Sequence, residues 1–256
     1  MQGSQTPTAR VVLLGASNLT FGLRTVVAAA RARLGAPLDV LSAQGCGRSY
    51  RSRQSLLGRT LVSIDACGLW RALAERPKLP TYALLTDFGN DLGYGSRAEQ
   101  VEPWIARALD RLQPFDAQIV VTGLPLASLQ RMPAWEFGLW ARVLFPLRRI
   151  ERARLLVEAE DLERRIVELA RTRGLARVEP QLAWYGRDPI HVARAHRAAA
   201  WGAYVAGWKC APHAGATSPL RIRGRAWYEQ VRVLGVERGR AQPSAGCADG
   251  STISLY

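Results

Sequence analysis

The sequence predicts an α/β protein whose parallel sheet is covered by helices on both faces. Short apolar or β-branched runs recur along the chain, and the stretches between them are long enough for a helix. These runs are residues 10–14, 38–41, 82–86 and 118–122. Near-continuous apolar strands are typical of a parallel sheet buried on both faces. With 256 residues, 48% of them hydrophobic, the chain can also bury a large core.

The first predicted strand and helix follow each other closely. The run at 10–14 ends at Gly15, and apolar residues then recur at helical spacing from Leu23 to Leu34. Gly35 stands at the position of a helix C-cap. We therefore expect a strand, a tight turn and a helix in this order.

After the fourth strand the sequence predicts mostly helix. Residues 124–150 are interrupted by Pro125, Pro133 and Pro146, which indicates a loop with short helices. A long amphipathic helix is expected from about Leu147 to Arg173, because apolar residues recur there at helical spacing until Gly174. A fifth short strand is expected at 176–178, and an Ala-rich helix at 192–208.

The chain is expected to form one main domain. We expect residues 1–9 to be disordered, residues 10–209 to form the α/β domain with a sheet of about five strands, and residues 210–256 to form a small β-rich C-terminal appendage. The polar N-terminus lacks the apolar core of a signal peptide, and no apolar run approaches about 18 residues. The sequence thus predicts a cytoplasmic protein without a membrane span.

The chain is strongly basic, with 35 Lys and Arg against 21 Asp and Glu and a formal net charge of +14. Such a charge suggests nucleic acid or an anionic surface as a partner. However, the only lysines are Lys78 and Lys209, and the arginines are scattered along the whole chain. That distribution indicates biased amino-acid usage, so we expect no specific nucleic-acid partner.

The cysteines point to neither a metal site nor a redox site. The four of them stand far apart with no C-x-x-C pair, at Cys46, Cys67, Cys210 and Cys247. This spacing argues against a zinc ribbon and against a dithiol pair. We therefore expect no metal and no cofactor.

The first of three chemically interesting segments is residues 15–19 (GASNL), directly after the first predicted strand. Open parallel sheets assemble their ligand sites at such strand ends. Ser17 would start a helix there, and the helix dipole favours developing negative charge beside it. A serine in this position is equally suited to a helix N-cap, which is the commoner arrangement for such a segment alone.

Two further segments follow later strands. In residues 88–91 (FGND), the Asn90 amide can donate to an oxyanion, or it can stabilise an Asx turn together with Gly89. In the loop after the last predicted strand, Asp188 stands three residues before His191. A carboxylate so placed can orient an imidazole and fix its tautomer.

Taken in this order, the segments resemble the sequence blocks of the SGNH (GDSL-type) hydrolase family. The likeness covers most of residues 10–209, and it implies a flavodoxin-like three-layer α/β/α sandwich. It also implies that Ser17 is a nucleophile and that Asp188 and His191 complete a catalytic triad. Ser17 lacks the G-x-S-x-G surroundings of the α/β-hydrolases.

The resemblance further implies an oxyanion hole. Its donors would be the Ser17 N–H, a glycine N–H and the side chain of Asn90. The best match for the glycine is Gly47, with Gly45 as the alternative.

Two positions depart from the family pattern. Ala16 stands where the family usually has aspartate, and Phe88 stands where the G-x-N-D block has its first glycine. Neither position carries the proton transfer. The departures therefore bear on loop geometry and leave the chemistry in place.

The implied function is that of an esterase or lipase-like serine hydrolase, which cleaves a small-molecule carboxylic ester through an acyl-enzyme. Water or another alcohol would then accept the acyl group. Two alternatives stay open on the sequence alone. They are a catalytically silent SGNH-like binding protein and a basic nucleic-acid-binding protein.

The candidate substrate-binding residues are Trp135, Trp140 and Trp184. The aromatic stretch 135–145 is placed to wall an apolar part of the substrate, although packing against the sheet explains it equally well. Three arginines beside the oxyanion glycine suit either an anionic substrate or a solvated basic surface. They are Arg48, Arg51 and Arg53.

Overall fold

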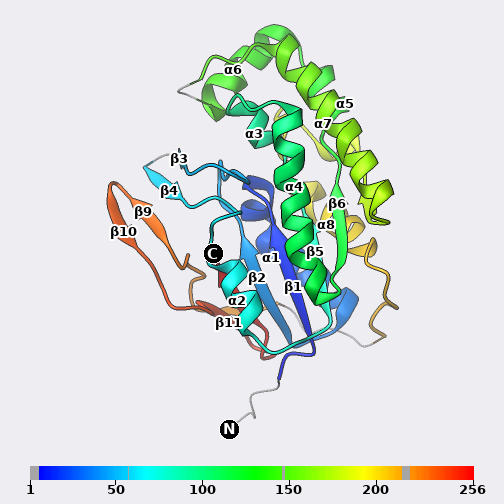
Figure 1. Ribbon diagram of the computed structural model, residues 1–256, viewed down its shortest axis with the longest axis vertical. Helices are drawn as coiled ribbons and strands as arrows, with labels where there is room; N and C mark the ends of the chain where they lie inside the picture. The colour runs from blue at the N-terminus through cyan, green and yellow to red at the C-terminus, as the bar shows by residue number, and fades with distance from the viewer. Residues whose placement is uncertain (1–5, 57, 146–147, 215–219) are drawn as a thin grey trace.

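The computed structural model describes residues 6–56, 58–145, 148–214 and 220–256 (Figure 1). The helices of this part are α1 (Ser17–Leu34), α2 (Leu69–Glu75), α3 (Gly89–Gly93), α4 (Ala98–Leu112), α5 (Leu126–Arg131), α6 (Ala134–Leu144), α7 (Arg152–Thr172) and α8 (Arg197–Ala206), with 3-10 turns η1 (Gln113–Phe115), η2 (Leu182–Trp184) and η3 (Arg194–His196). The strands are β1 (Ala9–Leu14), β2 (Leu38–Ala43), β3 (Gln54–Leu56), β4 (Arg59–Leu61), β5 (Thr81–Leu85), β6 (Gln118–Thr122), β7 (Ala176–Val178), β8 (Ile222–Arg223), β9 (Val231–Val233), β10 (Val236–Arg238), β11 (Ala245–Cys247) and β12 (Thr252–Leu255).

The central sheet has the strand order β7-β6-β5-β1-β2-β12-β11-β8. All neighbours from β7 to β12 pair in parallel, and β11 and β8 continue the sheet in antiparallel pairing. The predicted α/β class with a parallel sheet is confirmed. The five predicted strands form the run from β7 to β2, and the sixth parallel strand, β12, comes from the C-terminal residues.

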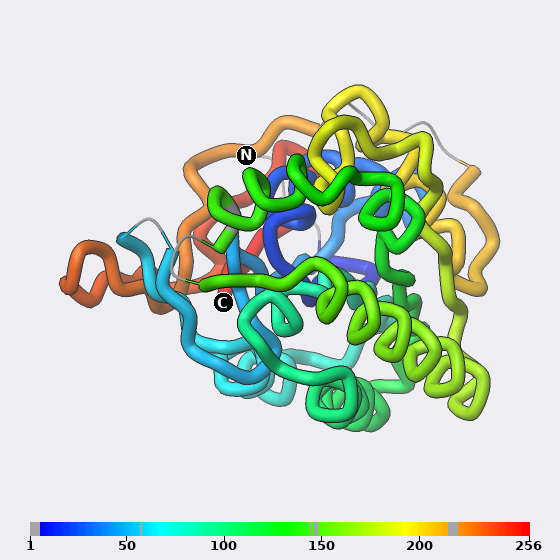
Figure 2. The backbone as a smooth tube through the Cα atoms, turned by 90° about the horizontal axis from the view of Figure 1, so that it is seen from above, coloured from blue at the N-terminus to red at the C-terminus, as the bar shows by residue number. Residues whose placement is uncertain are grey.

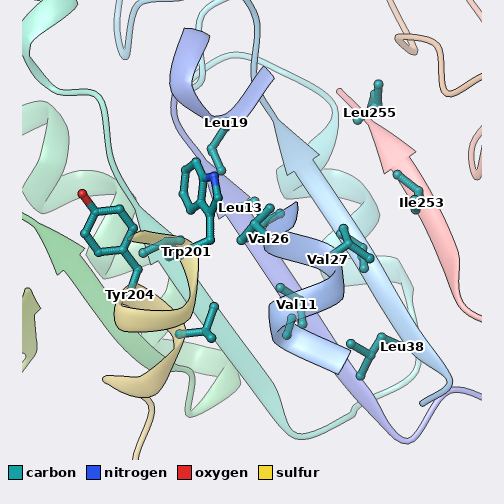
Figure 3. Close-up of a cluster of buried hydrophobic side chains, with 14 of the residues drawn as sticks. Val11, Leu13, Leu19, Val26, Val27, Leu38, Trp201, Tyr204, Ile253 and Leu255 are labelled. Atoms are coloured by element: carbon teal, nitrogen blue, oxygen red, sulfur yellow. The ribbon is translucent and has the colours of Figure 1, made fainter. Parts of the chain in front are cut away.

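Alternate residues of β1 face two separate cores. Val11 and Leu13 pack in a cluster with α1 and α8, whereas Val12 and Leu14 pack in a cluster with α2, α4 and α7. Figure 3 shows the first cluster, with Trp201 of α8 beside Leu19 and Val26 of α1. Helices thus cover both faces of the sheet, which makes three layers.

A second, smaller sheet has the order β10-β9-β4-β3. It joins a hairpin that follows the Gly47 loop to a hairpin of the C-terminal residues, and it projects to one side of the body in Figure 2. Residues 220–256 are therefore β-rich as expected, with β9 and β10 in the projecting sheet and β8, β11 and β12 in the central sheet. The boundary at residue 209 stays a prediction.

Several element boundaries in the structure differ from the predicted ones. The predicted disorder of residues 1–9 lies partly outside the described residues, and β1 already begins at Ala9. α7 begins at Arg152, and the predicted helix start near Leu147 lies outside the described residues. The predicted helix at 192–208 begins only at Arg197, because Val192 is held in a bridge with Tyr185 and donates its N–H to a side chain of α1.

No helix of the described part is long and apolar enough to cross a membrane. No group of three or more His, Cys, Asp or Glu residues in that part could hold a metal ion.

Candidate active site

The carboxyl ends of β1 and β5 and the loop after η2 bring three polar segments together. Ser17 is the first residue of α1. His191 Nε2 lies 2.7 Å from Ser17 Oγ, and His191 Nδ1 lies 2.6 Å from Asp188 Oδ2. Serine, imidazole and carboxylate thus form one continuous hydrogen-bonded chain. In this geometry an imidazole can take the proton of a serine hydroxyl.

Asp188 also fixes the loop that carries the imidazole. Its Oδ1 accepts the backbone N–H groups of Ile190 and His191, both at 3.0 Å. Burial would raise the pKa of Asp188, but the hydrogen bond and charge of His191, together with these backbone bonds, outweigh burial and lower it. The ionised carboxylate favours the tautomer with a proton on Nδ1, which leaves the Nε2 lone pair facing Ser17.

Ser17 is not the N-cap of α1. The N-cap residue is Ala16, and no side chain caps the helix. The N-cap interpretation of Ser17 is therefore wrong, because its hydroxyl is hydrogen-bonded to His191 instead. Since Ser17 stands in the first turn of α1, its oxygen lies beside the positive end of the helix dipole. Phe21, one turn further along α1, packs edge-on against the His191 ring with the ring centroids 5.3 Å apart.

Asp87 holds the turn that carries Ser17. Its φ of +63° is a left-handed conformation, which aspartate tolerates better than most residues. Oδ2 accepts the N–H groups of Ala16 at 2.8 Å and Asn18 at 3.1 Å, and Oδ1 accepts the Asn18 side-chain amide at 2.8 Å. The N–H groups on either side of Ser17 are thus occupied. Within the described residues the Ser17 N–H itself has no hydrogen-bond partner, so it stays available to a ligand.

Asn18 ties this turn to the loop of the imidazole. Its Nδ2 donates to the carbonyl of Ile190 at 2.9 Å, and its Oδ1 accepts the N–H of Val192 at 2.9 Å. These two residues flank His191, so one side chain holds the loop on both sides of the ring. The roles of Asn18 and Asp87 were not predicted from the sequence. A polar residue beside a candidate nucleophile and an aspartate at a strand end were the available signals.

Asn90 lies in α3 and lines the same pocket as Ser17. Its side chain is nearly buried, and its Nδ2 donates to the Arg48 carbonyl at 3.4 Å. An amide nitrogen carries two N–H groups, so this long contact leaves the other N–H for a ligand. The structure therefore brings Asn90 and Ser17 to one cavity, as an oxyanion hole requires.

The third predicted oxyanion donor, a glycine N–H, is not placed at the pocket by its lining residues. Gly47 has a φ of +71°, which favours glycine, and its carbonyl accepts the Tyr94 hydroxyl at 2.6 Å. Neither Gly47 nor Gly45 is among the residues that line the pocket. The choice between them as an oxyanion donor stays a prediction.

Asp91 is buried beneath the loop that follows Gly47. It accepts the Ser49 hydroxyl and, at 2.9 Å, the Tyr50 N–H. Ser49 Oγ in turn accepts the N–H groups of Arg51 and Ser52. Burial raises the pKa of Asp91 to about 6, although these hydrogen bonds act in the opposite direction. We call residues 47–52 the Gly47 loop.

Two of the three arginines beside Gly47 make hydrogen bonds or ion pairs within the protein. Arg48 is buried and donates to the backbone carbonyls of Gln44, Val62 and Tyr256. Arg51 forms an ion pair with Asp65 at 2.6 Å. These contacts favour a structural role over the recognition of an anionic substrate. Arg53 is exposed.

An apolar pocket adjoins Ser17. Its empty volume is about 800 Å³, including its open mouth. Its polar lining residues include Ser17, Asn18, Asp87 and Asn90. Apolar side chains from several elements form most of the remaining wall, and they are Leu92, Leu124, Leu129, Phe145, Leu155, Ala159, Ile190 and Val192.

None of the three predicted tryptophans lines this pocket. Trp184 is buried and packs edge-on against Tyr204, with ring centroids 5.5 Å apart. Trp135 is 71% exposed, and Trp140 is half-buried beside Phe137. The reason lies in α6, which packs through Phe137 and Ala141 and so turns Trp135 towards solvent. Of the predicted aromatic stretch, Phe145 alone is among the lining residues.

Comparison with known proteins gives a likeness of fold. No family model matches the sequence, and no curated protein matches it. Among solved structures, a carbohydrate acetylesterase family member from Sinorhizobium meliloti is 16% identical, with a TM-score of 0.52 over 77% of this chain and 95% of the other. The acetyl xylan esterase AlAXEase is 11% identical, with a TM-score of 0.51 over 77% and 98% of the two chains.

A member of the lipolytic protein G-D-S-L family from Veillonella parvula is 10% identical, with a TM-score of 0.48 over 77% of this chain and 96% of the other. The two structures with TM-scores above 0.5 confirm the α/β/α fold that the resemblance to the SGNH (GDSL-type) hydrolases implied. The chain has an α/β/α fold that enzymes named as esterases also have.

Proposed function

We propose that this protein hydrolyses carboxylic esters through a covalent acyl-enzyme. The observation that carries the proposal is the hydrogen-bonded chain from Ser17 Oγ to His191 Nε2 and from His191 Nδ1 to Asp188. This hydrogen-bonded chain of side chains adjoins a pocket that Ser17 and Asn90 both line. The fold shared with proteins named as acetylesterase and acetyl xylan esterase supports the same reaction class.

In the first half of the reaction, His191 Nε2 takes the proton of Ser17 as Oγ attacks the ester carbonyl. The carbonyl oxygen becomes an oxyanion, which the Ser17 N–H, the Asn90 side chain and the Gly47 N–H would stabilise. The imidazolium then gives its proton to the leaving alcohol, and the acyl group stays on Ser17. Asp188 orients the ring and stabilises its positive charge.

In the second half, His191 takes a proton from water as the water oxygen attacks the acyl carbonyl. The Ser17 oxygen then leaves with the proton from the imidazolium, and the free acid departs. The mechanism uses only these side chains and backbone N–H groups. The apolar pocket would hold the acyl group, because its lining is aliphatic and aromatic.

Hydrolysis of 4-nitrophenyl esters together with labelling by a fluorophosphonate tests this function. We expect turnover and labelling in the wild type and in Ser55→Ala, which alters an exposed serine of β3. In Ser17→Ala and His191→Ala we expect losses on the order of 10⁴ or more, and the double variant should be scarcely worse, because nucleophile and base act as one unit. Absence of both turnover and labelling in the wild type would instead favour a binding protein.

A further inference from the structure

One face of α6 exposes large apolar side chains. Trp135, Leu139 and Val143 are 71%, 55% and 68% exposed. They stand four residues apart, so they lie on one side of the helix. The opposite side packs into the protein through Phe137 and Ala141. We call Trp135, Leu139 and Val143 the α6 apolar face.

This face forms the wall of a shallow hollow. The other lining residues are Glu136, Trp140 and Arg187. Exposed apolar side chains gathered on one helix face and bordered by polar residues form a surface that can bind a protein, a ligand or a membrane. The charges around the hollow indicate which of these it fits.

The charge around the face is mainly positive. Arg142 lies on the same side of α6 as Trp135 and Leu139 by helical spacing, and Arg131 and Arg187 are exposed nearby. Glu136 is the one acidic residue among those that line the hollow. A short helix with Trp and Leu on one face and arginines beside them matches the surface of an anionic bilayer, where apolar groups enter the headgroup region and cations pair with phosphates.

The position of the face connects it to the pocket beside Ser17. α6 lies at the end of the molecule towards which the parallel strands run (Figure 1). Phe145, the residue that ends α6, lines the pocket, and Arg187 directly precedes Asp188. A surface bound to α6 would thus lie close to the site where an ester would enter.

We propose that the α6 apolar face binds an anionic lipid surface. This binding would keep the pocket at Ser17 close to the lipid. The contact is peripheral, made by one helix face and its arginines. It goes beyond ester hydrolysis, because it is a binding property that a catalytically inactive protein would keep.

Sedimentation with lipid vesicles tests the proposal in the Ser17→Ala background, so that hydrolysis plays no part. We expect the protein to bind vesicles containing phosphatidylglycerol and to bind pure phosphatidylcholine vesicles much more weakly. Binding should weaken in about 1 M salt, where charges are screened within about 3 Å. Trp135→Ala/Leu139→Ala should bind about tenfold more weakly, because two apolar side chains lose their burial, and Arg142→Gln about fivefold more weakly.

The control removes equally exposed apolar groups elsewhere. Leu234, between β9 and β10, is 83% exposed, and Val236, the first residue of β10, is 55% exposed. This hairpin lies away from α6 (Figure 1). Leu234→Ala/Val236→Ala should bind vesicles like the wild type. Equal binding of both vesicle types, no binding at all, or an equal loss in the control would overturn the proposal. A dimer seen by analytical ultracentrifugation that Trp135→Ala/Leu139→Ala dissociates would overturn it too, by assigning the face to a second copy of the chain. If the double variant failed to fold, Arg142→Gln and the salt series would decide.

Discussion

Asp87 and Asp91 stand four residues apart after β5, and each holds one side of the candidate active site. Asp87 is half-buried and accepts three N–H groups from the turn around Ser17. Asp91 is buried and accepts one hydroxyl and one N–H from the Gly47 loop. One short segment therefore sets the turn around Ser17 and the Gly47 loop relative to each other.

The difference between the two aspartates lies in burial. Asp91 is far enough from water that its pKa rises to about 6, so its charge changes near neutral pH. The turn around Ser17 is instead linked through Asn18 to the loop of His191. A change in the charge of Asp91 would therefore act first on the Gly47 loop, because Asp91 is the carboxylate that holds it.

Asn90→Ala tests the oxyanion side and should have the largest effect of the substitutions compared here. We expect kcat to fall by about 10²–10³ with little change in KM, because the amide would engage the substrate oxygen mainly in the transition state. Steady-state kinetics on one ester measures kcat and KM, and a melting curve for each protein checks folding. Loss of folding would instead point to a role of Asn90 in the turn alone.

Asp87→Gly tests the nucleophile side. Glycine adopts a positive φ without strain, so this change removes the carboxylate and keeps the backbone conformation accessible. We expect kcat to fall on the order of 10²-fold, because a small displacement of reacting groups is that costly. Asp87→Asn keeps one acceptor oxygen and should lose less. Wild-type kcat in Asp87→Gly would show that Ser17 needs no such anchor.

The pH dependence of stability tests the burial of Asp91. Its folded pKa of about 6 exceeds the ordinary value of 3.8, so its contribution to stability is complete below about pH 4 and is lost as the pH rises through about 6. The shift corresponds to about 3 kcal/mol. Urea unfolding of the wild type and Asp91→Asn from pH 4 to 7.5 should show this loss only in the wild type. Asp116→Asn, which changes an exposed aspartate, should lose stability with rising pH as the wild type does. An unfolding free energy of the wild type that does not change with pH would contradict the expectation.

Leu129→Ala tests the pocket and should have the smallest effect. If Leu129 contacts two methylenes of a longer acyl chain, its loss should lower kcat/KM for octanoate esters relative to acetate esters by about tenfold. Trp135→Ala, which changes a residue outside the pocket, should leave this ratio unchanged. Measuring kcat/KM of both variants on esters of increasing acyl-chain length tests this. A lowered ratio in Trp135→Ala with an unchanged ratio in Leu129→Ala would instead favour binding of the acyl group by the tryptophans.

The sequence predicted the parts of the fold that depend on local pattern. β1, β2, β5 and β6 coincide with the predicted apolar runs and β7 with the predicted fifth strand, and Ser17, Asp188 and His191 come after strand ends in the sequence. The β3–β4 hairpin was not predicted. β12 was not predicted, because Thr252 to Leu255 is only four residues long and its partner β2 lies more than two hundred residues earlier. Pairing over such a separation leaves no local signal.

The sequence placed the aromatic residues less well. Trp135 and Trp184 were expected at the substrate because they lie between site segments, yet one faces solvent and the other packs on Tyr204. Which side of a short helix faces the protein depends on what it packs against, and α6 packs through Phe137. The anchoring role of Asp87 was missed for a related reason, since it depends on a backbone conformation that composition does not reveal.

The place of β12 in the sheet also matters while the chain is being made. A ribosome synthesises β2 long before residues 252–256, and until then the outer edge of β2 carries unpaired N–H and C=O groups. Over the same interval Arg48, in the Gly47 loop, lacks the Tyr256 carbonyl to which it donates. The growing chain therefore passes through a stage with an open strand edge and an incompletely anchored loop, and at that stage it is exposed to the intermolecular pairing that chaperones oppose.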